Sequence, residues 1–166
     1  ELLYSAVLNI LLAVTISLVT ETFFPTFLFM MAFVIIRQYI GGYHARTHIG
    51  CMSILGTVLI VFSQLVRYIP SGAETTISIT LTIVSVILAI MFAPVEHYNK
   101  PLSESEKGSL RKKGITAVMV TSILIIVLSL FVSVRRYGMY ISLGMLTAAS
   151  AMFCQVIKYR AMQYKE

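Results

Sequence analysis

The stretch that decides the class of this protein is ITAVMVTSILIIVLSLFVSV, from Ile115 to Val134, which contains no charged residue. A second uncharged stretch, ISITLTIVSVILAIMFA, runs from Ile77 to Ala93. Apolar runs of about 18 residues or more are long enough to cross the hydrocarbon core of a bilayer as helix. A transmembrane barrel would show short alternating segments instead. In lipid the backbone must satisfy its own hydrogen bonds, so these runs predict membrane-spanning helices.

The composition of the whole chain agrees with this interpretation. Of its 166 residues 58% are hydrophobic and 12% are charged, whereas a soluble domain carries about 25% charged residues. The net charge is +6, but the basic residues cluster between apolar runs, as in proteins that orient themselves in a membrane. We therefore expect lipid, and no nucleic acid, as a partner. No cleavable signal peptide is predicted, and Cys51 and Cys154 form no disulfide framework.

The predicted fold is all-α, a polytopic transmembrane helical bundle in one domain over residues 1–166. The segment at 27–40 is short for a crossing, at about fourteen residues, which leaves a re-entrant segment as an alternative. Pro25 and Arg135–Gly138 are interpreted as turns, and 94–114 as a basic cytoplasmic loop. The six apolar segments expected are about 2–20, 27–40, 49–69, 77–93, 115–134 and 139–157.

The positive charges predict an orientation. If all six segments cross and 94–114 is cytoplasmic, ten of the thirteen lysines and arginines lie inside, and the reverse topology would place ten outside, against the usual bias. We therefore expect a multi-pass protein of the cell membrane with both termini in the cytoplasm. The ten residues counted as inside are Arg37, Arg46, Lys100, Lys107, Arg111, Lys112, Lys113, Lys158, Arg160 and Lys165.

Ionisable residues near the membrane are concentrated between Arg37 and Cys51, and such residues indicate function because they are costly there. His44 and Cys51 are seven residues apart. On a straight helix this separation is about 10 Å, so a working pair requires a break, which the neighbouring glycines permit. An imidazole beside a thiol favours the nucleophilic thiolate. The spacing alone also fits a small apolar cysteine beside an interfacial histidine.

Metal binding is an equally open interpretation of the spacing. His44, His48 and Cys51 follow one another at i, i+4 and i+7, on one face of a helix and with ligand types that zinc accepts. A closed site would need a fourth ligand, for which Glu96 or His97 is available.

A resemblance to a known family separates these alternatives. The pattern of Arg37, Gly42, His44 and Cys51 resembles the signature of the accessory gene regulator protein B (AgrB) family, membrane peptidases of Gram-positive quorum sensing. A looser similarity follows in Phe92-Ala93-Pro94, then Lys100-Pro101 and a basic run. The resemblance covers nearly the whole chain. Relatives usually carry a polar or amphipathic N-terminal stretch, which this sequence does not show before Glu1.

The resemblance implies a thiol endopeptidase that cuts an AgrD-like precursor peptide on its C-terminal side and closes the product into a thiolactone or lactone. It implies that Cys51 is the nucleophile and His44 the acid and base, without cofactor or metal. For Arg37 it leaves three roles open, namely activation of Cys51, binding of a precursor carboxylate and snorkelling to the interface. Gly42 is expected to permit a tight backbone path. Gln38, Ser53, Gln64 or a backbone carbonyl remains open as the group that orients His44.

The remaining residues have simpler interpretations. His48 is expected to be a bystander and Cys154 a packing residue. The precursor is the expected partner of the basic segment, and a homodimer is the expected assembly. Two other functions remain as alternatives, a non-catalytic peptide exporter or scaffold and a zinc-dependent protease that uses His44, His48 and Cys51. The candidate precursor-binding residues are Lys100, Lys107, Arg111, Lys112 and Lys113.

Overall fold

The structure is a computed structural model that describes the whole chain except residues 1, 43–47, 71, 96–102 and 164–166. The described residues form helices and no strand, which confirms the predicted all-α fold. The helices are α1 (Leu2–Val19), α2 (Phe23–Ile40), α3 (His48–Arg67), α4 (Glu74–Phe92), α5 (Glu104–Leu130) and α6 (Arg135–Gln163).

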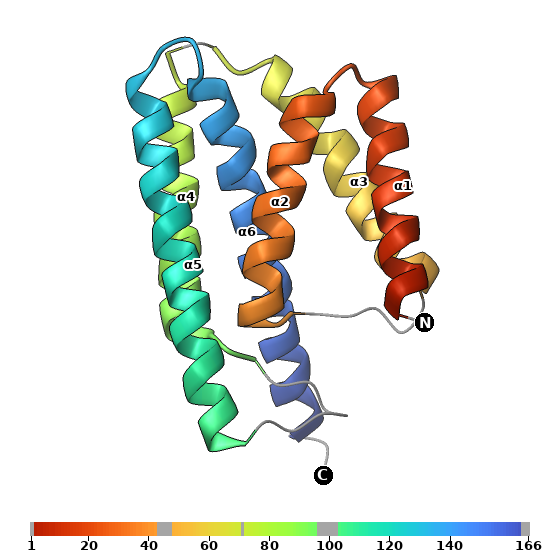
Figure 1. Cartoon of the computed structure of the whole chain (residues 1–166), viewed down its shortest axis with the longest axis vertical. Coiled ribbons are helices and arrows are strands. Elements are labelled where there is room, and N and C mark those ends of the chain that lie inside the picture. The colour runs from red at the N-terminus through yellow and green to blue at the C-terminus, as the bar shows by residue number, and fades with distance from the viewer. Residues whose placement is uncertain (1, 43–47, 71, 96–102, 164–166) are drawn as a thin grey trace.

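The helices run alternately up and down in one bundle (Figure 1). Helix α6 packs against α2, α4 and α5, and these four helices form the main group. Both termini lie at the same end of the bundle, together with the end of α2, the end of α4 and the start of α5. We call this the signature end, and the end that holds Glu74 and Arg135 the opposite end.

Helices α1 and α3 form a separate pair beside the main group (Figure 1). A β-carbon at Gly56 of α3 would lie 3.4 Å from Leu12 and 3.6 Å from Ile16, both in α1. Helix α3 also reaches α2, because the rings of Phe62 and Phe29 are 6.3 Å apart. A half-open apolar pocket of about 300 Å³ lies between α1 and α2, and the α1–α3 pair contacts the main group less extensively than the helices of the main group contact one another.

The exterior of the bundle is apolar and its interior contains small polar residues, the reverse of a soluble domain. Met91 and Val120 are more than half exposed, whereas Ser78, Thr82 and Ser85 of α4 are buried. The three buried hydroxyls donate to carbonyls one turn earlier in α4, so no polar group is left unpaired by their burial. An apolar exterior is stable in lipid, where small residues at the interfaces let helices approach closely.

Four described helices are long and apolar enough to cross a membrane, at Phe23–Ile40, Glu74–Phe92, Glu104–Leu130 and Arg135–Tyr159. Shorter apolar helices cover Leu8–Val19 and Met52–Arg67. Helix α2 is continuous over 18 residues, which corresponds to about 27 Å. The segment expected at 27–40 is therefore longer than predicted, and its length favours a full crossing over the re-entrant alternative. The chain is a multi-pass membrane protein.

Two predicted turns are wrong because they lie inside helices. Pro25 occupies the first turn of α2, where the missing N–H has no intrahelical partner to lose. Arg135 begins α6, and the connection before it consists of residues 131–134. The edge-to-face contact of Phe24 with Tyr137, whose ring centroids are 5.3 Å apart, packs these two helix starts together.

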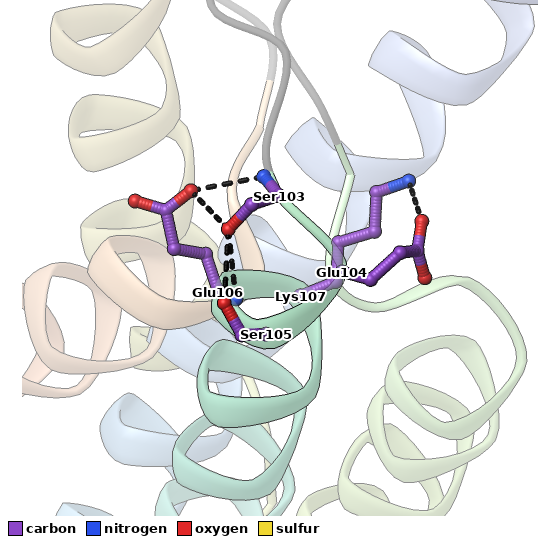
Figure 2. A network of polar contacts seen from close by, with 5 residues as sticks. All are labelled: Ser103, Glu104, Ser105, Glu106 and Lys107. Atoms are coloured by element: carbon purple, nitrogen blue, oxygen red, sulfur yellow. Dashed lines mark hydrogen bonds and ion pairs between the residues drawn. The ribbon is translucent and has the colours of Figure 1, made fainter.

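The predicted loop at 94–114 is also wrong for residues 104–114, which are helical. Helix α5 begins with a capping box (Figure 2) in which the Ser103 backbone N–H donates to Glu106 at 2.9 Å and the Glu106 N–H donates to the Ser103 hydroxyl at 3.3 Å. This reciprocal pair satisfies N–H groups that a helix otherwise leaves open at its start. Lys107 donates to Glu104 at 2.9 Å in the same turn. Lys107, Arg111, Lys112 and Lys113 therefore lie on α5, and Lys100 lies outside the described residues.

Candidate active site

The signature stretch leaves α2 at Gly41, which has a positive φ of 77°. Its N–H donates to the Arg37 carbonyl at 3.0 Å and closes the last turn of α2. A β-carbon at this position would lie 2.6 Å from the Val95 carbonyl oxygen. Both the left-handed backbone and this close approach exclude a side chain, so position 41 requires glycine.

Residues 93–95 lie directly against Gly41, and we call this segment the wall. The Val95 N–H donates to the Ile40 carbonyl at 3.0 Å, and Ile40 and Ala93 are both buried. The two sequence patterns, the signature after Arg37 and the segment Phe92-Ala93-Pro94, therefore meet at one end of the bundle.

Arg111 ties this wall to helix α5. Its guanidinium donates from Nη1 to the Ala93 carbonyl at 2.9 Å and from Nη2 to the Ile90 carbonyl at 3.0 Å. These carbonyls belong to the C-terminal end of α4, where a positive charge is favourable. Binding of a precursor by Arg111 remains a prediction. In the structure its guanidinium is hydrogen-bonded to backbone carbonyls at the end of α4.

Gly42 is buried and lies against helix α6. A β-carbon there would be 3.6 Å from Ala151 and 3.6 Å from the Met152 nitrogen, which is ordinary van der Waals contact. The tight backbone path expected at Gly42 is therefore found one residue earlier, at Gly41. A side chain larger than that of alanine at position 42 would press on α6.

Arg37 lies in the last turn of α2 and is half-buried. Its guanidinium carbon is 5.1 Å from the centre of the Phe33 ring, a distance at which a cation is attracted to the face of an aromatic ring. The arginine is thus held at the signature end beside a buried aromatic side chain. The three roles left open for Arg37 remain predictions.

The proposed nucleophile lies in the first turn of α3, which begins at His48. The side chains of His48 and Cys51 and the whole of His44 lie outside the described residues, so the pairing of His44 with Cys51 stays a prediction. Helix α2 ends at Ile40 and α3 begins at His48, and the break expected between His44 and Cys51 stays a prediction because residues 43–47 lie outside the described residues. The described part of the chain contains no group of three metal-ligating side chains, and the zinc alternative involves His44, which is outside it.

Gln64, one of the residues considered for orienting His44, follows Cys51 by thirteen positions on one continuous helix, about 20 Å along the axis. Its role stays a prediction because His44 lies outside the described residues. Gln38 and Ser53 are exposed on α2 and α3.

Sequence reasoning missed Gln155 of α6. This side chain is buried, and its Oε1 has no hydrogen-bond partner among the residues that the structure describes. It lies one turn beyond Ala151 and Met152, the residues that contact Gly42. No spacing or motif in the sequence distinguishes this glutamine from other polar residues in the helix.

The other predicted residues are four lysines of the basic segment and Cys154. Lys112 and Lys113 are exposed near the start of α5, and Lys107 is paired with Glu104. Lys100 lies outside the described residues. Cys154 was expected to be a packing residue, but its side chain is exposed on α6 and is not buried within the bundle.

Comparisons with known proteins agree with this combination of fold and sequence pattern. The family model described as accessory gene regulator B matches residues 1–158. A protein of Clostridium perfringens (strain SM101 / Type A) named as AgrB-like is 24% identical over 161 residues, which cover 93% of this chain and 72% of that protein. No solved structure matches the chain.

Proposed function

Because the chain belongs to the accessory gene regulator B family, which acts in processing the autoinducer of agr quorum sensing, we propose that it is the cysteine endopeptidase and cyclase of that process. Its substrate is an AgrD-like precursor peptide, cut on the C-terminal side of the segment that becomes the signal. The product is a cyclic thiolactone or lactone peptide. No cofactor takes part.

The proposed reaction has two steps. The Cys51 thiolate attacks the scissile carbonyl, and the C–N bond breaks while His44 transfers the thiol proton to the departing amine. The resulting acyl group is held as a thioester on Cys51. A precursor cysteine or serine then attacks this thioester, the acyl group passes to its sulfur or oxygen, and Cys51 is released.

The observation that carries the proposal is the contact between the two family patterns. Gly41 follows Arg37 in the first pattern, and Val95 follows Ala93-Pro94 in the second. The hydrogen bond from Val95 to Ile40 and the approach of Val95 to Gly41 place them side by side. Residues far apart in sequence and matched to one family thus form one structural unit at the end of the bundle from which the chain continues to Cys51.

Two further features support the chemistry. The first turn of a helix carries unpaired N–H groups and the positive end of the helix dipole, and Cys51 lies in such a turn. A site at the membrane boundary also limits water. A thioester that must survive until cyclisation requires this protection, since water would release a linear acid.

We propose that the signature end faces the cytoplasm. The termini and the basic start of α5 lie at this end (Figure 1), and cytoplasmic segments are rich in lysine and arginine. Lys112 and Lys113 are exposed there and attract the acidic tail of the precursor. They also attract anionic lipid. A homodimer is the proposed assembly.

The test is the pH dependence of Cys51 alkylation by iodoacetamide in the detergent-solubilised chain, with Cys154→Ala to remove the second thiol. We expect a midpoint well below the ordinary thiol value of about 8.5, and its return to that value in His44→Ala. A midpoint near 8.5 that is indifferent to His44 would count against an activated pair.

Product analysis separates the alternatives. The peptidase proposal requires a cleaved precursor tail and loss of cleavage in Cys51→Ser. Transport of uncut precursor would identify an exporter. Full processing by Cys51→Ser together with inhibition by a chelator would identify a metal-dependent protease.

A further inference from the structure

We propose that Arg111 is a positioning residue for the signature stretch. It holds residues 93–95 against the end of α2, and this contact fixes the point and direction in which the chain leaves α2 at Gly41. The inference rests on the proposed function, because it assigns to Arg111 the placement of the stretch that leads to Cys51.

The first step is the pair of hydrogen bonds made by the guanidinium. Arg111 spans two carbonyls, Ile90 at 3.0 Å and Ala93 at 2.9 Å, with separate nitrogens. The planar fork of arginine fits two acceptors at once, whereas a lysine ammonium is a single point charge. The geometry of the contact therefore requires arginine and not simply a positive charge.

The second step passes from α4 to α2. Ala93 is fixed by Arg111 on its carbonyl side, and its own N–H donates to Ala89 at 2.9 Å. Two residues later the Val95 N–H donates to Ile40 at 3.0 Å. The Val95 carbonyl then lies so close to Gly41 that even a β-carbon there would be at 2.6 Å.

The third step is a second contact made by α5. Gly114, three residues after Arg111, lies against the end of α2, and a β-carbon there would be 3.1 Å from the Ile40 side chain. One turn of α5 therefore contacts both the end of α4 and the end of α2. This arrangement closes a triangle around Ile40 and Gly41, formed by the end of α2, the end of α4 and an internal turn of α5.

These contacts favour positioning over direct precursor binding. Arg111, Lys112 and Lys113 are all exposed, and Arg111 differs from the two lysines because two of its nitrogens donate to backbone carbonyls at the end of α4. The neighbouring lysines provide a matched control, since their removal takes away positive charge from the same turn without touching α4.

The experiment compares Arg111→Lys, Arg111→Gln and the double variant Lys112→Gln/Lys113→Gln, each in the Cys154→Ala background and in nanodiscs. The first readout is hydrogen exchange at the backbone amide of Val95. We expect exchange about tenfold faster in both Arg111 variants, the effect of losing roughly one hydrogen bond, and no change in the double lysine variant. This readout requires neither precursor nor activity.

The second readout is the pH profile of Cys51 alkylation by iodoacetamide. We expect the midpoint to rise by about one pH unit toward the ordinary value of about 8.5 in both Arg111 variants. The double lysine variant should keep the parent midpoint. An equal rise in the double lysine variant would show a general effect of charge and overturn the inference.

Two further outcomes would overturn the inference, and a third separates it from the proposed function. Unchanged Val95 exchange in Arg111→Gln overturns the inference whatever happens at Cys51. Faster exchange with an unchanged midpoint shows a contact that does not position the site, which also overturns it. If the parent midpoint is already ordinary, the activated pair of the proposed function fails, and Val95 exchange alone decides whether Arg111 holds the wall in place.

Gly114→Ala provides a second route if the Arg111 variants do not fold. The added β-carbon would press on Ile40 while Arg111 keeps its bonds. We expect the same rise in Val95 exchange, and Gly108→Ala on the same helix, where a β-carbon meets nothing within 4 Å, should leave it unchanged. Equal exchange in the two glycine variants would refute the triangle of contacts.

Discussion

The two ends of the bundle are held together by different kinds of contact. At the opposite end, the buried carboxylate of Glu74 lies between Arg135 at 2.8 Å and Arg136 at 2.6 Å and joins the start of α4 to the start of α6. At the signature end, Arg111 and Val95 join helix ends through main-chain carbonyls.

This difference matters because ion pairs and backbone contacts respond to different changes. The stability of a charged cluster depends on the sign and number of its charged groups, and its side chains can move to accommodate one another. A backbone contact requires one position of the main chain, so it fixes the direction of the residues that follow. We infer that the opposite end contributes mainly stability, and that the signature end contributes the geometry of the site.

The largest expected effect is at Glu74. Glu74→Gln removes the partner of two arginines at a buried position, which typically costs about 3 kcal/mol. Denaturant unfolding in detergent measures the loss, and the Cys51 alkylation midpoint of the folded protein should not change. Arg136→Gln added to Glu74→Gln removes one uncompensated charge and should recover part of the stability. A shift in the Cys51 midpoint would mean that the two ends are not independent.

A smaller effect on stability is expected at Gly41. Gly41→Ala places a β-carbon on a backbone with φ of 77° and 2.6 Å from the Val95 oxygen, and strain of this kind costs about 2 kcal/mol. Gly42→Ala is the matched control, because its β-carbon would meet α6 at 3.6 Å. Unfolding and Val95 exchange should both distinguish the two variants, and equal losses would contradict the placement of the tight turn at Gly41.

The smallest effect is expected at Ser103. Ser103→Ala removes the capping box of α5 (Figure 2) and should cost about 1 kcal/mol. Ser103→Asn keeps a side-chain acceptor for the cap and should restore most of this loss. Amide exchange over residues 104–107 locates the effect, which should not extend to Val95. Loss of the Val95 hydrogen bond in Ser103→Ala would show that the start of α5 depends on its cap to place Arg111.

Hydropathy predicted the number and order of the apolar segments because lipid requires long uncharged runs. Hydropathy could not define the helix ends, because a helix can continue beyond the hydrocarbon of the membrane into the polar region. Residues 104–114 include six charged residues, which exclude this segment from the hydrocarbon but not from a helix. The pattern Ser103-x-x-Glu106, typical of a capping box, was the available signal for the start of α5.

The sequence pointed to side chains of the candidate site and not to its backbone contacts. Arg37, His44 and Cys51 were proposed from their resemblance to a family pattern, because their residue types and spacing alone also fit metal binding, and their roles stay predictions. The acceptors of Arg111 are the carbonyls of Ile90 and Ala93, which every residue type possesses, so no sequence pattern indicates that contact. The two adjacent glycines indicated a bend, but only the position of Val95 shows that Gly41 is the one that requires it.

The separation of the α1–α3 pair from the main group has a consequence for affinity. Cys51 belongs to α3, whereas Gly41 and the wall it meets belong to the main group. Any free energy needed to bring the two units into register is subtracted from that released on binding the precursor. The apparent dissociation constant then equals the intrinsic one divided by the fraction of molecules already in register. Under the proposed function, a substitution that raises the fraction of molecules in register would therefore raise the affinity for the precursor without contacting the peptide.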